Sequence, residues 1–234
     1  MAEQALARAR ELEQLSAQLS HELKNPLGAI KALVQLSARD AAEGRSRERL
    51  QVAEGEIERM DQILREYLTF SRPFGKLQPE PASLGALADE VLLLLGTQAA
   101  GAGVALRRQG EAHLEVDPRC LREALFNLVA NGLVATPPGG CVQVEIEELD
   151  GVARISVRDT GRGMAPEVLE RVGTPFFTTR EEGSGLGVAL ARAAFVQHGG
   201  SLEYRSAEGK GTTATGTLPR RFRSGRGDGA AAAR

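Results

Sequence analysis

The stretch His21-Glu22-Leu23-Lys24-Asn25-Pro26-Leu27 lies inside a long amphipathic segment, and the periodicity of that segment decides the first part of the fold. At about 100° per residue, its apolar side chains fall into a single helical stripe. The stripe consists of Leu12, Leu15, Leu19, Leu23, Leu27, Ile30 and Val34. His21 points about 180° away from the middle of this stripe, which predicts a solvated position rather than a core position.

Two neighbours of His21 make this helix face chemically unusual. Asn25 lies one turn further on, on nearly the same face. The ring of Pro26 clashes with the carbonyl of Glu22 and removes a helical hydrogen bond, so we expect the helix to bend or loosen beside His21. A titratable imidazole in this setting is a candidate nucleophile or proton carrier, and the alternative is an ordinary solvated surface histidine.

The N-terminal third of the chain is predicted to form a helical hairpin. Residues 2–38 favour one helix, residues 41–46 a break, and the residues that follow, to about 71, a second helix. The second helix has apolar residues in near-heptad spacing at Leu50, Ala53, Ile57, Met60, Leu64 and Leu68. One hairpin has too little core to stand alone, so we predict a homodimer that closes a four-helix bundle. The alternative is a monomer in which the rest of the chain covers the stripe.

Composition excludes several classes of function. Lys and Arg total 29 against 31 Asp and Glu, a net charge of −2, which gives no reason to expect nucleic-acid binding or a polybasic membrane patch. Cys120 and Cys141 stand in no metal-ligand spacing and are predicted to be reduced thiols. The longest apolar run, Val91–Leu95, is too short to span a membrane. We therefore expect a cytosolic chain without membrane contact of its own, compatible with the cytosolic portion of a longer membrane-attached sensor.

The rest of the chain favours an α/β sandwich with helices on one face of a mixed sheet. Residues 73–82, rich in proline, are predicted to be a linker between a hairpin at 1–72 and a domain at 83–219. Residues 220–234 are predicted to be a disordered tail. The expected helices are 83–99, 118–135, a short one near 166 and one ending near 198, and the expected strands are 104–107, one near 114, 141–148, 152–158, 201–206 and 212–218.

Two motifs of this domain carry polar side chains at defined positions. Asn127 and Asn131 are four residues apart on one predicted helix, so both amides share a face. Amide oxygens suit a partly hydrated Mg²⁺ bound to nucleotide phosphates. Asp159-Thr160-Gly161-Arg162-Gly163 follows a strand directly, and an aspartate there can accept a hydrogen bond from an exocyclic amine such as adenine N6. The alternative for this second motif is a tight turn.

Two further motifs suit phosphate groups. Gly183-Ser184-Gly185-Leu186-Gly187 opens a helix, whose N-terminal N–H groups form an anion site. The spacing fits neither a dinucleotide fingerprint nor a Walker loop. Thr174-Pro175-Phe176-Phe177-Thr178-Thr179-Arg180 precedes it; the two aromatics can anchor a mobile flap, and Thr178, Thr179 and Arg180 can contact phosphate oxygens. The alternative is an ordinary loop with a buried phenylalanine pair.

In this order, behind the histidine hairpin, the motifs resemble the catalytic core of the sensor histidine kinases of two-component systems, over residues 16–219. The resemblance links His21–Leu27 to the H box of that family, Asn127–Asn131 to the N box, Asp159–Gly163 to the G1 box, Phe176-Phe177 to the F box and Gly183–Gly187 to the G2 box. The sequence of residues 175–180 is similar to that of the nitrogen-regulator sensor branch of the family. Gly132 departs from the family, which usually has alanine there, at a cost of about 1 kcal/mol in helix propensity.

The resemblance implies a dimerisation and phosphotransfer hairpin joined to a Bergerat-type ATP-binding domain. His21 would receive the γ-phosphoryl group of ATP and pass it to an aspartate on the receiver domain of a response regulator. Glu22 is the partner that the family provides for the imidazole, and Asn25 is implicated in phosphatase activity toward the regulator. An unperturbed pKa of about 6.5 leaves most of the imidazole neutral and nucleophilic at cytosolic pH.

The resemblance also assigns the nucleotide site. Asp159 would read adenine, and Asn131 with Asn127 would hold Mg²⁺ on the phosphates. The expected ATP-binding residues are Asn127, Asn131, Asp159, Gly161, Gly163, Thr178, Thr179, Arg180, Gly183, Ser184, Gly185, Leu186 and Gly187.

Two other functions compete with this one. An ATPase of the DNA gyrase or heat-shock chaperone type needs a glutamate base one turn before the metal asparagine, but that position is Asn127 and Glu123 is a further turn back. A dimeric scaffold that binds nucleotide without transferring phosphate is the second alternative, and the intact boxes argue against it.

Overall fold

The computed structural model describes residues 23–24, 26–34, 48–58, 60, 63–64, 77–149, 151–180 and 183–220. The chain divides into two compact units, Met1–Gly75 with Gly173–Leu190, and Lys76–Val172 with Ala191–Arg234. In the first unit, residues 23–24, 26–34, 48–58, 60 and 63–64 are helical. These helical residues fall within the two predicted helices of the hairpin.

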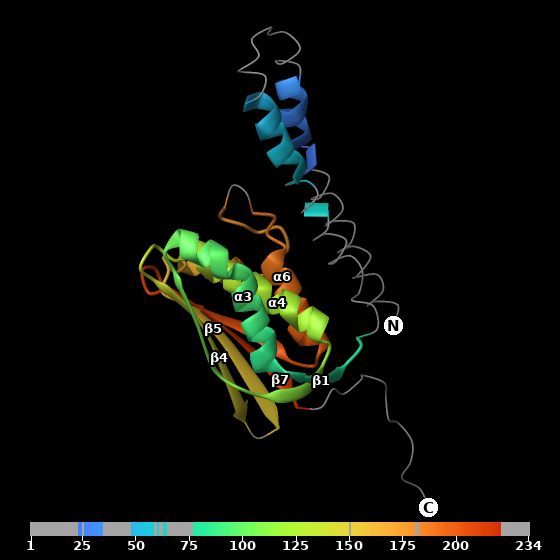
Figure 1. Ribbon diagram of the computed structural model, residues 1–234, viewed down its shortest axis with the longest axis vertical. Coiled ribbons are helices and arrows are strands. Elements are labelled where there is room, and N and C mark those ends of the chain that lie inside the picture. The colour runs from blue at the N-terminus through green and yellow to red at the C-terminus, as the bar shows by residue number, and fades with distance from the viewer. Residues whose placement is uncertain are drawn as a thin grey trace, which may run out of the picture. The chain divides into compact units, whose positions relative to one another are not determined.

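The second unit is built on a five-stranded mixed sheet with the strand order β2-β4-β5-β7-β6 (Figure 1). Strands β2 and β4 are parallel, and every other neighbouring pair is antiparallel. The elements are β1 (Glu80–Ser83), α3 (Leu84–Ala102), β2 (Ala105–Gly110), β3 (His113–Val116), α4 (Pro118–Ala135), β4 (Cys141–Leu149), β5 (Val152–Asp159), α5 (Pro166–Arg171), α6 (Gly187–Gln197), β6 (Ser201–Ser206) and β7 (Thr212–Pro219). The predicted sandwich with a mixed sheet is confirmed.

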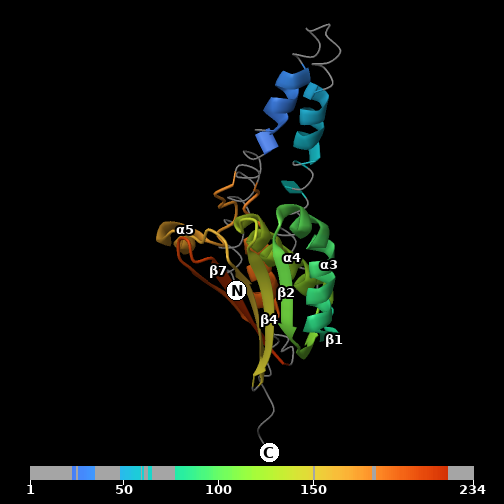
Figure 2. The same cartoon turned by 60° about the vertical axis from the view of Figure 1, so that its left-hand side comes forward.

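Helices α3 and α4 lie over one face of this sheet, and α6 packs on the same face (Figures 1 and 2). Period-two alternation in the strands sends apolar side chains such as Val144, Ile155 and Val157 into the layer between sheet and helices. Phe195 of α6 is fully buried, and its ring lies directly over Gly216 of β7, where any side chain would collide with it. The core is therefore one continuous apolar layer, as expected for a two-layer sandwich.

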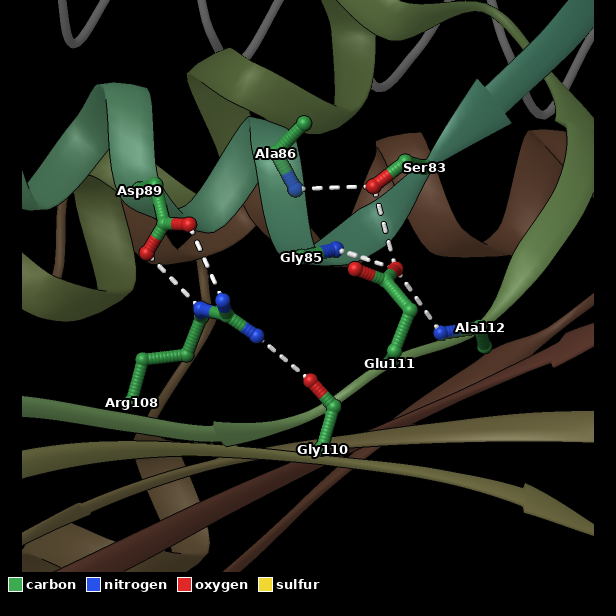
Figure 3. Close-up of polar contacts among 8 residues, drawn as sticks. All are labelled: Ser83, Gly85, Ala86, Asp89, Arg108, Gly110, Glu111 and Ala112. Atoms are coloured by element: carbon green, nitrogen blue, oxygen red, sulfur yellow. Dashed lines mark hydrogen bonds and ion pairs between the residues drawn. The ribbon is translucent and has the colours of Figure 1, made fainter.

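The N-terminus of α3 is held by polar side chains, drawn in Figure 3. The Ser83 hydroxyl accepts a hydrogen bond from the Ala86 backbone N–H at 2.9 Å, which caps the helix. The Glu111 carboxylate accepts from the Ser83 hydroxyl at 3.0 Å and from the Gly85 N–H at 2.9 Å. A Cβ at Gly85 would collide with that carboxylate, so the Glu111 side chain would have to move to accommodate any other residue there. The cap explains why α3 begins at Leu84.

Helix α3 is the one helix among the described residues that is long and apolar enough, by length and composition, to cross a membrane. Its buried residues include Leu84, Leu87, Val91 and Leu95, which face the sandwich interior. The core helix of a sandwich domain has the same length and apolar composition.

Asp117 joins three parts of the second unit. It is 1% exposed, caps α4 through a hydrogen bond from the Arg119 N–H at 3.1 Å, and accepts a second from the Gln78 N–H at 3.0 Å. Its own N–H donates to Nε2 of buried His198 at 2.9 Å, while His198 Nδ1 contacts the Ala194 carbonyl at 2.7 Å. The imidazole therefore carries its proton on Nδ1 and is neutral in this arrangement.

From the pKa values of His198 and Asp117 we predict that the protein loses stability in acid in two steps. Burial lowers the pKa of His198 below 6.5, so the unfolded chain takes up a proton there first, and stability falls as the pH drops below about 6.5. Burial alone would raise the pKa of Asp117, but hydrogen bonds from Arg119 and Gln78 lower it to about 2. Asp117 therefore contributes about 2 kcal/mol to the free energy of unfolding. This contribution is present above the unfolded pKa of 3.8 and is lost as the pH falls through about 2.

Urea unfolding across this pH range measures both steps. The His198→Gln variant cannot titrate at this position, so we expect it to lose the upper step and keep the lower one. An unchanged upper step in that variant would assign it to another group.

The structure adds one strand that sequence did not predict. Residues 80–83 form β1, which pairs antiparallel with β3, with Glu80 opposite Val116 and Ser83 opposite His113. The linker predicted at 73–82 thus shares its last residues with a strand. Proline at position 81 is tolerated because this two-stranded sheet consists of edges only.

Candidate nucleotide-binding site

Helix α4 carries the two asparagines predicted to serve the metal and phosphates. It begins at Pro118, whose missing N–H and fixed φ suit the first helical position, and Asp117 caps it. One face is buried in the core, including Leu121, Leu125 and Leu128. Asn127 and Asn131 lie beside that face and are half-buried, so both amides are held by a rigid element at the border of the core.

Asp159 ends β5 and is the most strongly positioned polar residue of the site. The residue is 6% exposed. Its Oδ1 accepts hydrogen bonds from the Gly161 N–H at 2.8 Å and the Thr212 N–H at 3.1 Å. Among the described residues, no hydrogen bond reaches Oδ2. The carboxylate is thus oriented by one oxygen and presents the other as an acceptor.

Burial raises the pKa of Asp159, and the two backbone hydrogen bonds partly oppose that rise. A buried carboxylate with one unused oxygen carries a desolvation cost that a hydrogen-bond donor on a ligand can offset. An exocyclic amine such as adenine N6 is a donor of this kind.

The glycines predicted beside Asp159 are required by close backbone contacts. A Cβ at Gly161 would lie 2.5 Å from the Ala135 carbonyl oxygen. Gly163 has φ 68° and would collide with the Ala207 carbonyl. At Gly132 of α4, a Cβ would lie 3.4 Å from Asp159 Cβ and 3.3 Å from Val142 Cγ1, tighter than ordinary contact. Helix α4 therefore passes close to Asp159 at the glycine that departs from the resembled family.

Sequence reasoning missed the part of the site contributed by the turn before β7. Thr212 donates the second backbone hydrogen bond to Asp159, and Gly211, at φ 76°, passes against the Asp159 carbonyl. The Ser206 hydroxyl accepts from the Met164 N–H at 2.9 Å and thereby holds the loop after Asp159. The run of glycines and threonines at 209–213 was the available signal, since such a run marks close backbone approach.

The predicted glycine loop and its preceding segment form a compact loop within the first unit. The Phe176 N–H donates to the Gly185 carbonyl at 3.1 Å, and Phe176 adopts φ 62°, which is rare for a residue with a side chain. Gly185 has φ 71°, and a Cβ there would lie 2.4 Å from the Phe176 carbonyl carbon. Thr178 Oγ1 accepts from the Arg180 N–H at 3.1 Å, and a Cβ at Gly183 would lie 2.6 Å from that oxygen.

The remaining predicted residues of this loop differ in exposure. Thr179 is exposed, whereas Ser184 and Gly187 are half-buried, and α6 begins at Gly187 as expected. The Ser184 hydroxyl accepts from the Leu186 N–H at 3.1 Å. Leu186 is fully buried, so its side chain anchors the loop, and its predicted contact with ATP would come from its backbone.

His21, Glu22 and Asn25 lie outside the described residues. Within the described residues, no group of three or more His, Cys, Asp or Glu side chains gathers to hold a metal ion. The metal donors that the sequence predicts in this domain are the neutral amides of Asn127 and Asn131 on α4. They suit a Mg²⁺ that keeps several waters and is held mainly by nucleotide phosphates.

The chain matches two families in succession. Residues 11–73 match the His Kinase A (phospho-acceptor) domain, and residues 116–221 match the histidine kinase-, DNA gyrase B- and HSP90-like ATPases. The chain therefore carries the two domains of a sensor histidine kinase catalytic core.

Individual relatives agree with this assignment. Over 211 residues the chain is 36% identical to the sensor histidine kinase ZraS of Salmonella typhimurium, covering 88% of this chain and 45% of ZraS. Over 211 residues it is 33% identical to sporulation kinase A of Bacillus subtilis, covering 89% of this chain and 34% of that protein. The chain thus spans less than half the length of these relatives. The fold resembles histidine kinase ThkA in its complex with the response regulator TrrA, with a TM-score of 0.77, 24% identity, and coverage of 94% of this chain and 66% of that one.

Proposed function

We propose that this chain binds ATP in the second unit, transfers the γ-phosphoryl group to His21, and passes it to an aspartate of a response regulator. The observation that carries the proposal is the buried Asp159 carboxylate, which two backbone N–H groups hold by one oxygen, while no donor among the described residues reaches the other. The match of residues 11–73 to a phospho-acceptor domain supplies the other substrate.

The proposed reaction needs alignment more than covalent chemistry. A ring nitrogen of His21 attacks the γ-phosphorus, the bond between that phosphorus and the bridging oxygen breaks, and ADP leaves. The ring must be neutral at the attacking nitrogen, and Glu22 would accept the proton on the other nitrogen. Neighbours at i and i+1 do not face each other on a regular helix, so this role depends on the helix distortion expected at Pro26.

We propose that Asn131 and Asn127 hold Mg²⁺ on the nucleotide phosphates, where the ion would neutralise charge on the transferred group. The fit rests on two half-buried amides at adjacent turns of a rigid helix. The loop around Gly183 and Gly185 would donate backbone N–H groups to the phosphates, together with Thr178, Thr179 and Arg180.

The alternative of direct ATP hydrolysis lacks its base. Asn127 stands one turn before Asn131, where a hydrolase of this superfamily needs a glutamate, and an amide cannot accept a proton from water. Glu123, one turn further back, is exposed.

Incubation with γ-labelled ATP separates the three candidate activities. A histidine kinase gives a phosphoprotein that is labile in acid and stable in alkali. A hydrolase releases only free phosphate, and a scaffold gives neither product. An acid-stable label, or none, would contradict the proposal.

We also propose that the hairpin dimerises. Apolar residues at heptad spacing are exposed in the single chain, with Leu50 at 56%, Ile57 at 55% and Leu64 at 41%, while Ala53 and Ile63 are buried. On the other described helical segment, Leu27 and Val34, also seven apart, are 56% and 53% exposed. Two such hairpins bury these stripes against each other in a four-helix bundle.

Charge at the exposed heptad positions is expected to abolish the dimer. The Leu50→Glu, Ile57→Glu double variant should sediment as a monomer at micromolar concentration, because two carboxylates would be buried without partners. The matched control is Leu93→Glu, Leu94→Glu on α3, which changes residues that are 82% and 66% exposed in the other unit. A control that dissociates equally, or a dimeric first variant, would contradict a dimer built on the hairpin.

We propose a partner and a location on the same basis. The complex of ThkA with a response regulator supports a receiver domain as acceptor, and Asn25 would serve phosphatase activity toward it. We place the chain in the cytoplasm, where ATP and receiver domains are found. Membership of the nitrogen-regulator sensor branch stays a prediction.

A further inference from the structure

A cavity of about 490 Å³ lies in the second unit between α5, α6 and β6. Its apolar wall is formed by Leu169, Val172, Val196 and Leu202. Neither Asp159 nor the asparagines of α4 line it, so it is separate from the candidate nucleotide site. Its volume falls in the range of about 300–1,000 Å³ that small-molecule sites occupy.

The Tyr204 hydroxyl is the polar group that distinguishes this cavity from a simple packing defect. Tyr204 lines the cavity, and its hydroxyl is buried without a hydrogen-bond partner among the described residues. Burial raises the pKa of Tyr204, so the phenol keeps its proton and remains a donor. A buried donor without an acceptor is costly, and native structures rarely keep one unless an ion, water or ligand completes it.

Arg192 adds positive charge at the same place. It lines the cavity, and its guanidinium donates to the Val172 carbonyl at 3.4 Å, which ties the end of α5 to α6. Its charge is close enough to Tyr204 to oppose the rise in the pKa of the phenol. A guanidinium has five N–H donors, so one backbone contact does not exhaust it.

Glu203, the other charged residue lining the cavity, does not cancel the positive charge of Arg192. Glu203 is exposed, whereas its neighbours Leu202 and Tyr204 are buried and half-buried. Strand alternation therefore sends the Glu203 side chain to the opposite face of the sheet, and only its backbone borders the cavity.

We propose that this cavity is a binding site for a small organic carboxylate with an apolar body. The carboxylate accepts hydrogen bonds from the Tyr204 hydroxyl and the Arg192 guanidinium, and the body packs against Leu169, Val172, Val196 and Leu202. Val196 is 57% exposed in the free protein, and such a ligand covers it. The site is independent of phosphoryl transfer.

The chain provides its own reporter for this proposal. It contains no tryptophan and two tyrosines, Tyr67 and Tyr204. In a Tyr67→Phe background, tyrosine fluorescence therefore reports on Tyr204 alone. Hexanoate is a suitable probe because it neither absorbs nor fluoresces where tyrosine does, and hexan-1-ol has the same chain without the charge.

We expect hexanoate to change the Tyr204 fluorescence saturably, with a dissociation constant in the millimolar range or below, as suits a ligand of its size. Hexan-1-ol should bind at least about tenfold more weakly, and Arg192→Gln should weaken hexanoate by a similar factor, the loss of one charge-assisted hydrogen bond. No saturable change, equal binding of the alcohol, or unaltered binding to Arg192→Gln would overturn the proposal.

Tyr204→Phe separates ligand binding from folding. Because the hydroxyl has no hydrogen-bond partner in the part of the chain that the structure describes, its removal should leave the melting temperature unchanged or higher. Calorimetric titration of this variant should show hexanoate binding weakened about tenfold or more. A marked fall in melting temperature would show that the hydroxyl is satisfied within the protein, and unchanged binding would show that it does not contact the carboxylate.

Discussion

Substitution of His21 by alanine is expected to abolish labelling of the protein by γ-labelled ATP. If the imidazole is the nucleophile, its removal leaves no atom in line with the γ-phosphorus, so the rate should fall on the order of 10³-fold or more. Nucleotide binding should persist, because Asp159 and its backbone donors belong to the other compact unit. Filter binding of label and calorimetric titration with ATP measure the two properties separately.

The chain itself supplies the controls for this experiment, since it contains three histidines. His198 is 2% exposed with both ring nitrogens engaged, so it cannot accept a phosphoryl group without unfolding. His113 is exposed on β3 and is the matched variant. We expect His113→Ala to be labelled like the unmodified protein. Label retained in His21→Ala and lost in His113→Ala would move the acceptor to β3 and contradict the proposal.

Local sequence signals were sufficient to predict the elements whose ends are set by residues close to those ends. Helix α4 runs from Pro118 to Ala135, as predicted, because an aspartate cap and a proline mark its start. The strands β4 and β5 follow from alternation around the turn at Gly151, and each extends one residue beyond its predicted end. Short-range chemistry sets these boundaries, so it can be read without a tertiary structure.

The missed features depend on partners far away in the chain. Strand β1 has no alternating pattern, and its pairing with β3 about thirty residues later gives it its conformation. Thr212 reaches Asp159 across 53 residues, so no local motif around Asp159 could reveal it. Gly132 likewise looked like a costly departure from the family, until the contact with Asp159 showed why a side chain has little room there.

Substitution of Asp159 by asparagine is expected to weaken ATP binding by about 10²-fold without destabilising the fold. The amide oxygen should take the place of Oδ1, because two backbone N–H groups point at that position. The amide NH₂ then occupies the position of Oδ2 and faces the adenine amine, donor against donor. Losing a charge-assisted hydrogen bond and creating this conflict together cost about 2–3 kcal/mol. Calorimetric titration with a non-hydrolysable ATP analogue measures the loss.

The asparagine variant also separates recognition from folding. It keeps both backbone hydrogen bonds and removes a buried charge whose pKa burial raises, so its melting temperature should stay the same or increase. Asp159→Ala leaves the Gly161 and Thr212 N–H groups without an acceptor and should melt at a lower temperature. Normal ATP binding by Asp159→Asn would remove Asp159 from the site, whatever its effect on stability.

The relative affinity for ATP and GTP tests the role of Asp159 most directly. Guanine carries a carbonyl oxygen where adenine carries its amine, so a carboxylate at Asp159 repels GTP while it accepts from ATP. The Asp159→Asn amide reverses both effects. Its NH₂ opposes the adenine amine, and it can donate a hydrogen bond to the guanine carbonyl. The ratio of ATP affinity to GTP affinity should therefore fall by more than the affinity for ATP itself. If the two affinities fell in parallel, Asp159 would act only through the shape of its loop, and the adenine-reading role would be wrong.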